Sequence, residues 1–320
     1  HQHRAEDRPT LQTSIRKLNK KGEVRVFTRT YYRPKELSSN YYEACFTPLI
    51  YPGQTVEAKL YLPESAPESL TAALYVYDDN RKTSHQAQGK PLTPGAWHTL
   101  RYDIPPMKDV CLSEVGVVLR NLGEVWETGS FHLESLDWSG GPDYECTFAC
   151  ERPESGGISQ WTRLRGFWRL EDGAYHGGGL GLCETYSGDI QWTDYTLECE
   201  LVPLTGDYHN INVRVGGALH SYAFGLAPDQ QVVLYKKDRE YNAVASAPFN
   251  WTHNETYRLS LTAQGNSLIA TVIAADGQTR QLTWDDPQTA YLSGQIGLST
   301  WHGGHTRYQS VRVHGINPTP

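Results

Sequence analysis

A stripe of polar side chains in the segment 210–215 could hold adjacent hydroxyl groups of a ligand. The segment alternates apolar residues with Asn210, Asn212 and Arg214. Because residues two apart in a strand share a face, these three side chains are expected on one side of a sheet. A guanidinium flanked by amides can form paired hydrogen bonds to neighbouring hydroxyls. The alternative is a solvated outer face, and the residues alone leave both interpretations open.

Two further side chains could complete the same site. Glu184 follows a glycine-rich stretch, and Tyr222 lies in a strand-like segment. A carboxylate beside Arg214 would accept hydrogen bonds from ligand hydroxyls. A phenol on that face could stack on the ligand or hydrogen bond to it. The alternatives are a loop acid in water for Glu184 and a core aromatic residue for Tyr222.

The segment 301–305, Trp-His-Gly-Gly-His, is unusual for a simple turn. Trp301 could offer a stacking surface, with His302 and His305 as hydroxyl partners, because the two glycines permit close backbone approach. Packing of Trp301 in the core is the alternative. A metal site would need a third ligand, and the spacing indicates none.

A pair of carboxylates raises the question of catalysis. Glu198 and Glu200 are expected on one strand face, and glycosidases use two such groups about 5–10 Å apart. The sequence contains no GxSxG, HExxH, P-loop or GxGxxG motif. Binding without catalysis is therefore favoured. The alternative is a glycoside hydrolase or lyase that depends on Glu184, Glu198 or Glu200.

Composition narrows the class of partner. The chain has 29 lysines and arginines against 36 acidic residues, a net charge of −7, so it lacks the basic surface that nucleic acids require. No apolar run approaches membrane-spanning length, so no membrane partner is expected. Six cysteines without a CxxC pair favour a reducing, cytoplasmic location over secretion, with a Cys146–Cys150 bridge as the alternative. Because the sequence begins with His1, we expect a covalently linked catalytic domain upstream.

Short alternating segments, such as 55–62 and 195–201, fill most of the chain and are bounded by turn residues. This pattern is typical of an all-β sandwich. The clearest break is Ser-Gly-Gly-Pro-Asp at 139–143, because glycine and proline end strands. We therefore predict a polar tail or linker over 1–22, one jelly-roll sandwich over 23–140 and a second, different sandwich over 141–320.

The second half carries four recognisable segments: WTDYTLE at 192–198, NINVRV at 210–215, YAFGL at 222–226, and a closing hairpin over 293–313. Over about 145–317 it resembles concanavalin-like domains of the laminin-G and glucanase type. It is similar to the module family that includes levan-binding modules, and to the C-terminal extension of some bacterial ADP-ribosylglycohydrolase-family proteins. The resemblance implies that an arginine at the position of Arg214 holds sugar hydroxyls.

The first half carries GAWHTL at 95–100, VGVVL at 115–119 and GSFHLE at 129–134. Over about 24–140 it resembles the galactose-binding-like jelly roll of many carbohydrate-binding modules. In that family the last strand often supplies an acidic ligand to a structural Ca²⁺. Glu134 occupies this position, with glutamate where aspartate is usual. The resemblance therefore implies a structural calcium ion at Glu134 and no other cofactor.

Together these features predict two tandem, non-catalytic β-sandwich modules, the second concanavalin-like, that bind an oligo- or polysaccharide. The predicted ligand-binding residues are Glu184, Asn212, Arg214, Tyr222, Trp301, His302 and His305. Two alternatives stay open. One is the hydrolase or lyase acting in the cleft of the second sandwich, and the other is an interaction scaffold for a partner catalytic domain.

Overall fold

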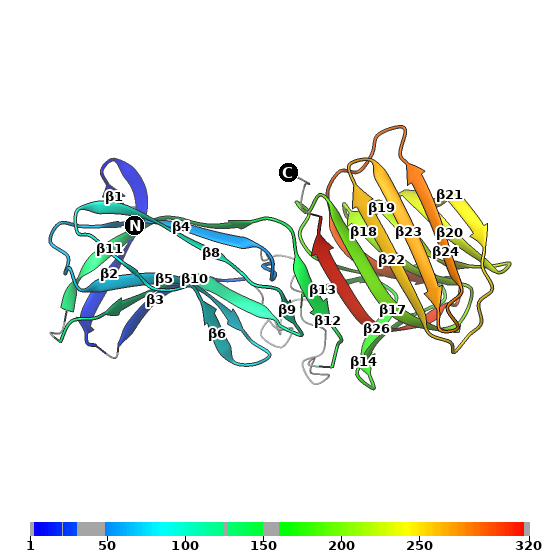
Figure 1. Cartoon of the computed structure of the whole chain (residues 1–320), viewed down its shortest axis with the longest axis horizontal. Helices are drawn as coiled ribbons and strands as arrows, with labels where there is room; N and C mark the ends of the chain where they lie inside the picture. Colours follow the sequence, from blue (N-terminus) through cyan, green and yellow to red (C-terminus); the bar gives the residue numbers. More distant parts are fainter. Residues whose placement is uncertain (1–2, 21, 31–48, 125–126, 150–159, 317–320) are drawn as a thin grey trace. The chain divides into compact units, whose positions relative to one another are not determined.

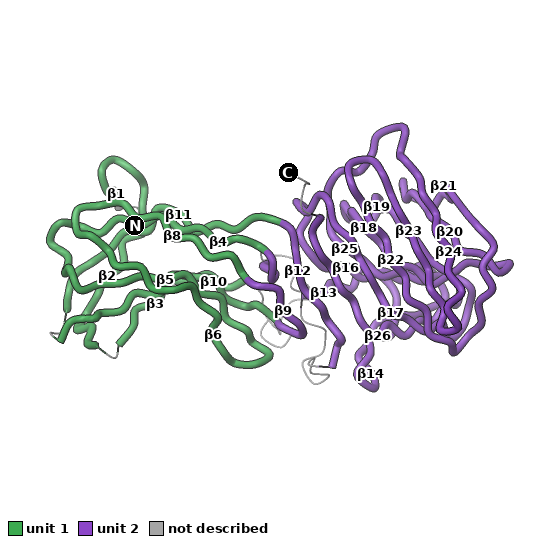
Figure 2. The backbone as a smooth tube through the Cα atoms, viewed as in Figure 1, with its two compact units in different colours: residues 1–30, 54–104, 111–140 green, residues 31–53, 105–110, 141–320 purple. Residues whose placement is uncertain are grey.

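The computed structural model describes residues 3–20, 22–30, 49–124, 127–149 and 160–316, and its regular elements are all β-strands. The predicted all-β class is confirmed. No helix in this part of the chain could span a membrane. The chain forms two compact units, shown in Figure 2. Unit 1 comprises His1–Thr30, Gln54–Ile104 and Cys111–Gly140, and unit 2 comprises Tyr31–Gly53, Pro105–Val110 and Gly141–Pro320.

Unit 1 consists of two sheets, with the strand orders β1-β2-β11-β4-β8 and β3-β10-β5-β6, and β7 pairs with β5. Along β4, every second residue from Val56 to Leu62 is buried, so one face of its sheet packs into a core. The strands are β1 (His3–Ala5), β2 (Arg8–Leu18), β3 (Glu23–Arg29), β4 (Thr55–Leu62), β5 (Leu70–Asp78), β6 (Thr83–Gln86), β7 (Lys90–Pro91), β8 (Ala96–Asp103), β10 (Leu112–Asn121) and β11 (Glu127–Ser139).

The prediction of a polar tail over 1–22 is wrong for residues 3–18, which form β1 and β2. Strand β2 pairs with β11 and buries Ile15 and Leu18. The turn between β1 and β2 is anchored on Trp97, whose indole N–H donates to Glu6 at 2.7 Å while the Arg8 guanidinium lies 4.8 Å from the ring centroid. Most of β2 faces water, so its composition resembles that of a linker.

Unit 2 is a sandwich of a nine-stranded and a seven-stranded sheet, seen in Figure 1 as a front and a back layer. The first has the order β14-β15-β26-β17-β22-β23-β24, with β12 beside β26 and β9 beside β12. Its strands are β9 (Met107–Lys108), β12 (Asp143–Cys146), β14 (Phe167–Glu171), β15 (Ala174–Gly178), β17 (Tyr195–Thr205), β22 (Tyr257–Gln264), β23 (Ser267–Ala274), β24 (Thr279–Asp285) and β26 (His305–Gly315).

The seven-stranded sheet has the order β13-β16-β25-β18-β19-β20-β21. Ile211 and Val213 of β18 are buried toward the core, so Asn210 and Asn212 face the opposite side. The strands are β13 (Trp161–Arg165), β16 (Cys183–Ser187), β18 (Tyr208–Val215), β19 (His220–Ala227), β20 (Gln231–Asp238), β21 (Glu240–Pro248) and β25 (Gln295–Trp301).

Unit 2 also contains two described segments from within the predicted first domain, 49–53 and Pro105–Val110. Strand β9 pairs in parallel with β12, and the Asp143 N–H donates to the Pro52 carbonyl at 2.7 Å. At Gly53, φ is +92° and a Cβ atom would lie 2.4 Å from the Asp143 nitrogen. Glycine is therefore required where these segments cross. The main division, between Gly140 and Gly141, coincides with the break in the sequence.

Candidate ligand-binding site

The side of the seven-stranded sheet that faces away from the nine-stranded sheet, here called the seven-stranded face, gathers several predicted site residues. The strand register aligns Glu184 with Ser299, and Ser299 with Asn210. The next row aligns Gly297 with Asn212. Glu184 and Asn212 therefore share this face, in adjacent rows, as a sugar site would require.

Glu184 is the centre of a buried polar cluster on the seven-stranded face. Its Oε1 pairs with the Lys237 ammonium, both side chains being at most 1% exposed, and accepts a hydrogen bond from the Tyr241 hydroxyl at 2.8 Å. Burial lowers the pKa of Lys237, although Glu184 opposes this shift. Burial and the charge of Glu184 raise the pKa of Tyr241. The cluster thus holds the Glu184 carboxylate in one position.

The side-chain amides of the two asparagines in β18 differ in their hydrogen bonding. Asn212 accepts from the Ser299 hydroxyl at 2.8 Å and donates to the Tyr241 hydroxyl at 3.0 Å. Both side-chain polar atoms of Asn210 are buried without a hydrogen-bond partner in the described part of the chain. Glu184 lies next to the Tyr186 hydroxyl, and burial together with the Glu184 carboxylate raises the pKa of Tyr186. Asn210 and Glu184 are both fully buried, so these side chains belong to the floor beneath the face and not to its surface.

Aromatic rings lie one row away on the same face. Trp301 stacks with Tyr241, at 4.5 Å between ring centroids and 21° between planes, and with Tyr208, at 4.9 Å and 27°. Tyr235 meets the indole edge-on. Sequence reasoning identified Trp301 but missed Tyr208, Tyr241 and Lys237. Their participation depends on how the sheet curves, and no local motif signals this.

A groove of about 370 Å³ opens over these rings. His302 at its rim is exposed and meets the Tyr208 ring edge-on. An apolar aromatic surface with a few convergent polar groups is the usual make-up of a small-molecule site. The lining residues are Leu182, Tyr208, Tyr235, Arg239, Glu240, Tyr241, Trp301 and His302.

Arg214 does not share a face with Asn212, so this part of the sequence prediction is wrong. A register shift between Asn212 and Val215 places Arg214 in a β-bulge with φ of +50°, which turns its side chain away from the expected stripe. The guanidinium is 1% exposed and bonds to Asp194 at 2.9 Å and to main-chain carbonyls, including that of Tyr291 at 2.7 Å. Arg214 therefore links the loops that contain Asp194 and Tyr291.

Two other predicted residues also lie apart from the groove. The Tyr222 hydroxyl donates to the Asp286 carboxylate at 2.6 Å and accepts from the Tyr291 N–H at 2.9 Å. Tyr222 is therefore buried, and its hydroxyl both donates and accepts a hydrogen bond within the protein. His305 lies on β26 of the other sheet, where its ring nitrogen is 3.1 Å from that of His176.

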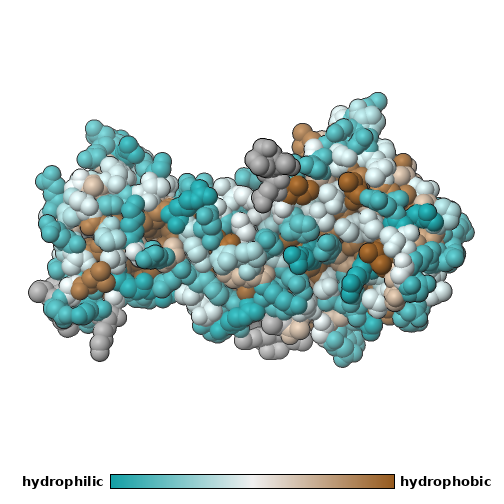
Figure 3. All heavy atoms as spheres, viewed as in Figure 1, coloured by the Kyte–Doolittle hydropathy of each residue, from teal (hydrophilic) through white to brown (hydrophobic). Residues whose placement is uncertain are grey.

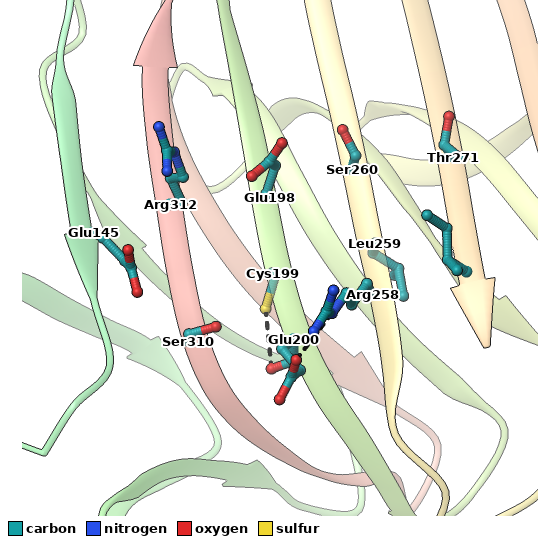
Figure 4. A pocket seen from close by; sticks show the side chains of 11 residues that line it. Glu145, Glu198, Cys199, Glu200, Arg258, Leu259, Ser260, Thr271, Ser310 and Arg312 are labelled. Atoms are coloured by element: carbon teal, nitrogen blue, oxygen red, sulfur yellow. Dashed lines mark hydrogen bonds and ion pairs between the residues drawn. The ribbon is translucent and has the colours of Figure 1, made fainter. Parts of the chain in front are cut away.

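Two of the three carboxylates of the hydrolase alternative share a groove, and the third lies apart from them. Glu198 and Glu200 project from β17 into a groove of about 470 Å³ on the outer face of the nine-stranded sheet, shown in Figure 4. Arg258 donates to Glu200 at 3.1 Å, and none of the described residues that line this groove is aromatic. Figure 3 shows hydrophilic, intermediate and hydrophobic residues interspersed on that side of unit 2. Glu184 lies on the opposite face of the sandwich.

Glu134 does not fit the calcium site that the sequence resemblance implies. Its carboxylate accepts hydrogen bonds from the Arg8 guanidinium at 3.1 and 3.4 Å. A guanidinium already neutralises the group that would bind the cation. Within the described ranges, no cluster of three or more His, Cys, Asp or Glu side chains has the arrangement of a metal site.

Solved structures similar to part of this chain include a carbohydrate-binding module and several lectins. No protein-family model and no curated protein matches the chain. The carbohydrate binding module CBM66 from Bacillus subtilis is similar at 20% identity and a TM-score of 0.44, over 49% of this chain and 96% of the module. Lectin I-B4 from Griffonia simplicifolia is similar at 12% identity and 0.39, over 49% and 94%. These values are too low to assign a family or a ligand.

Proposed function

We propose that the chain is a carbohydrate-binding protein without catalytic activity of its own, and that it binds glycans in the groove of the seven-stranded face. The observation that carries the proposal is a groove that combines stacked aromatic rings with the exposed polar side chains of Glu240 and His302. Sugar rings combine C–H surfaces, which pack on aromatic rings, with hydroxyls, which pair with amides and carboxylates. This face offers both kinds of contact together.

Each group has a defined part in the proposed site. Tyr208 and Tyr241, which are partly exposed beside Trp301, contact the apolar side of a sugar ring. Glu240, an exposed lining residue, accepts hydrogen bonds from sugar hydroxyls. The buried Glu184 holds Tyr241 in place beneath the ligand, and the exposed His302 contacts the ligand at the rim.

A glycan array followed by isothermal titration calorimetry tests this function. Trp301→Ala and Tyr208→Ala, both at lining residues, are each expected to weaken sugar binding by about tenfold or more, or ~1.4 kcal/mol. Arg312→Ala, in the groove of the nine-stranded sheet, is the matched control and should bind normally. The proposal fails if no sugar binds, or if both variants fold and bind as the unmodified protein does.

The cytoplasmic location and the linked catalytic domain belong to the same proposal. Cys183 and Cys199 are free thiols buried in unit 2, which supports a reducing compartment. Cys45 and Cys150, the latter part of the bridge considered above, lie outside the described residues. Co-purification of the full-length gene product with glycosidase activity would support a catalytic partner domain.

A further inference from the structure

Two arginines flank the groove of the seven-stranded face, and the inference drawn from them rests on the proposed function. Arg239, between β20 and β21, lines the groove. Arg165, at the end of β13, is aligned with Glu184 on the neighbouring strand. Both side chains are exposed, and neither guanidinium has an ion-pair partner in the described part of the chain.

Arg165 lies close enough to the buried cluster to affect the pKa values of two of its residues. Its positive charge lowers the pKa of Lys237 and opposes the rise in the pKa of Tyr186. Both residues lie beside Glu184, since Lys237 forms an ion pair with it and its negative charge raises the pKa of Tyr186. The guanidinium of Arg165 is thus within electrostatic range of the polar cluster, on the β13 side of this face.

The local charge is opposite in sign to that of the whole chain. Within the cluster Lys237 neutralises Glu184. Among the lining residues Arg239 balances Glu240, and Arg165, which lies outside the lining, adds one positive charge on this face. The chain as a whole carries −7. A surface of one sign set in a molecule of the other sign attracts and orients ligands of complementary charge.

We propose that the groove selects anionic glycans, with a carboxylate or sulfate group of the sugar bound by Arg165 or Arg239. The planar guanidinium presents paired N–H donors that match a carboxylate. Glu240 accepts hydrogen bonds from the hydroxyl groups of the bound sugar. The aromatic rings contact the apolar surface of the same sugar. An anionic sugar therefore binds more tightly than a neutral sugar of the same size.

Calorimetry with matched ligands tests this selectivity. Oligogalacturonate, a neutral galacto-oligosaccharide of equal length and its sulfated form are compared at about 50 and 300 mM NaCl. We expect an anionic ligand to bind about tenfold or more tightly than the neutral one at low salt, with a smaller advantage at high salt. Comparison of the uronate with the sulfate ester identifies which anion is preferred.

Variants assign the effect to the two arginines. Arg239→Gln and Arg165→Gln should reduce the preference for the anion while neutral-sugar binding persists, and Arg258→Gln in the other groove should retain the preference. Equal binding of neutral and anionic sugars, or a preference unchanged in both variants, would overturn this inference and leave the proposed function standing. Absence of binding to every sugar would overturn both.

Discussion

Lys237 of β20 and Glu184 of β16 form a buried ion pair although β25, β18 and β19 lie between their strands in the sheet. Neighbouring strands are about 4.8 Å apart, so a flat sheet would separate these backbones by about 19 Å. The two side chains together cannot cover that distance. The seven-stranded face must therefore be concave, and its concavity brings the edge residue Tyr241 over Trp301.

The ion pair predicts a specific pattern of stability. Glu184→Gln or Lys237→Met alone should lower the free energy of unfolding by about 3–5 kcal/mol, because each leaves an uncompensated buried charge. The double variant should lose much less than the sum of the single changes. Urea unfolding of the four proteins measures this coupling. Strict additivity would show that the two groups do not interact.

Arg214 is expected to act on stability and not on affinity. Arg214→Gln removes the ion pair with Asp194 and leaves the carbonyls of Thr193 and Tyr291 without their donor. The free energy of unfolding should fall by about 3 kcal/mol or more. The dissociation constant for sugar, measured well below the melting temperature, should stay unchanged. A loss of affinity in the folded variant would contradict this prediction and would show that Arg214 takes part in sugar binding.

The sequence predicts some residues of the face and not others, for physical reasons. Alternation with Ile211 and Val213 places Asn212 correctly, because strand periodicity is local. The same alternation fails at Arg214, since a bulge at a non-glycine residue leaves no mark in the sequence. Lys237 and Tyr241 were missed because their contact with Glu184 depends on the curvature of the whole sheet.

His209 should make unit 2 sensitive to acid. Its pKa is lowered to about 4, chiefly by burial. Neutral His209 has one N–H, which donates from Nε2 to the Gly206 carbonyl at 2.9 Å, while Nδ1 accepts from the Thr306 hydroxyl at 2.7 Å. The unfolded chain, with a pKa near 6.5, binds more protons below that pH. Stability is complete above pH 6.5 and falls by up to ~3 kcal/mol as pH drops to 4.

Unfolding in urea at pH 7 and pH 4.5 measures this dependence. His209→Gln should flatten it, whereas His220→Gln, at an exposed position, should leave it unchanged. His176 and His305 also have lowered pKa values, chiefly through burial, so a smaller slope of the same sign should persist in His209→Gln. An equal pH dependence in all three proteins would contradict the role of His209.

The N-terminal strand gives a matched pair of substitutions on β2. Ile15 is fully buried, whereas Leu11 on the same strand is 53% exposed. Ile15→Ala should lower the free energy of unfolding of unit 1 by about 2–5 kcal/mol, since it removes packed methyl groups and leaves a cavity. Leu11→Ala should change it by no more than about 0.5 kcal/mol. If residues 3–18 were a solvated tail, both substitutions would be neutral, so chemical unfolding of the two variants decides between a tail and a structural strand.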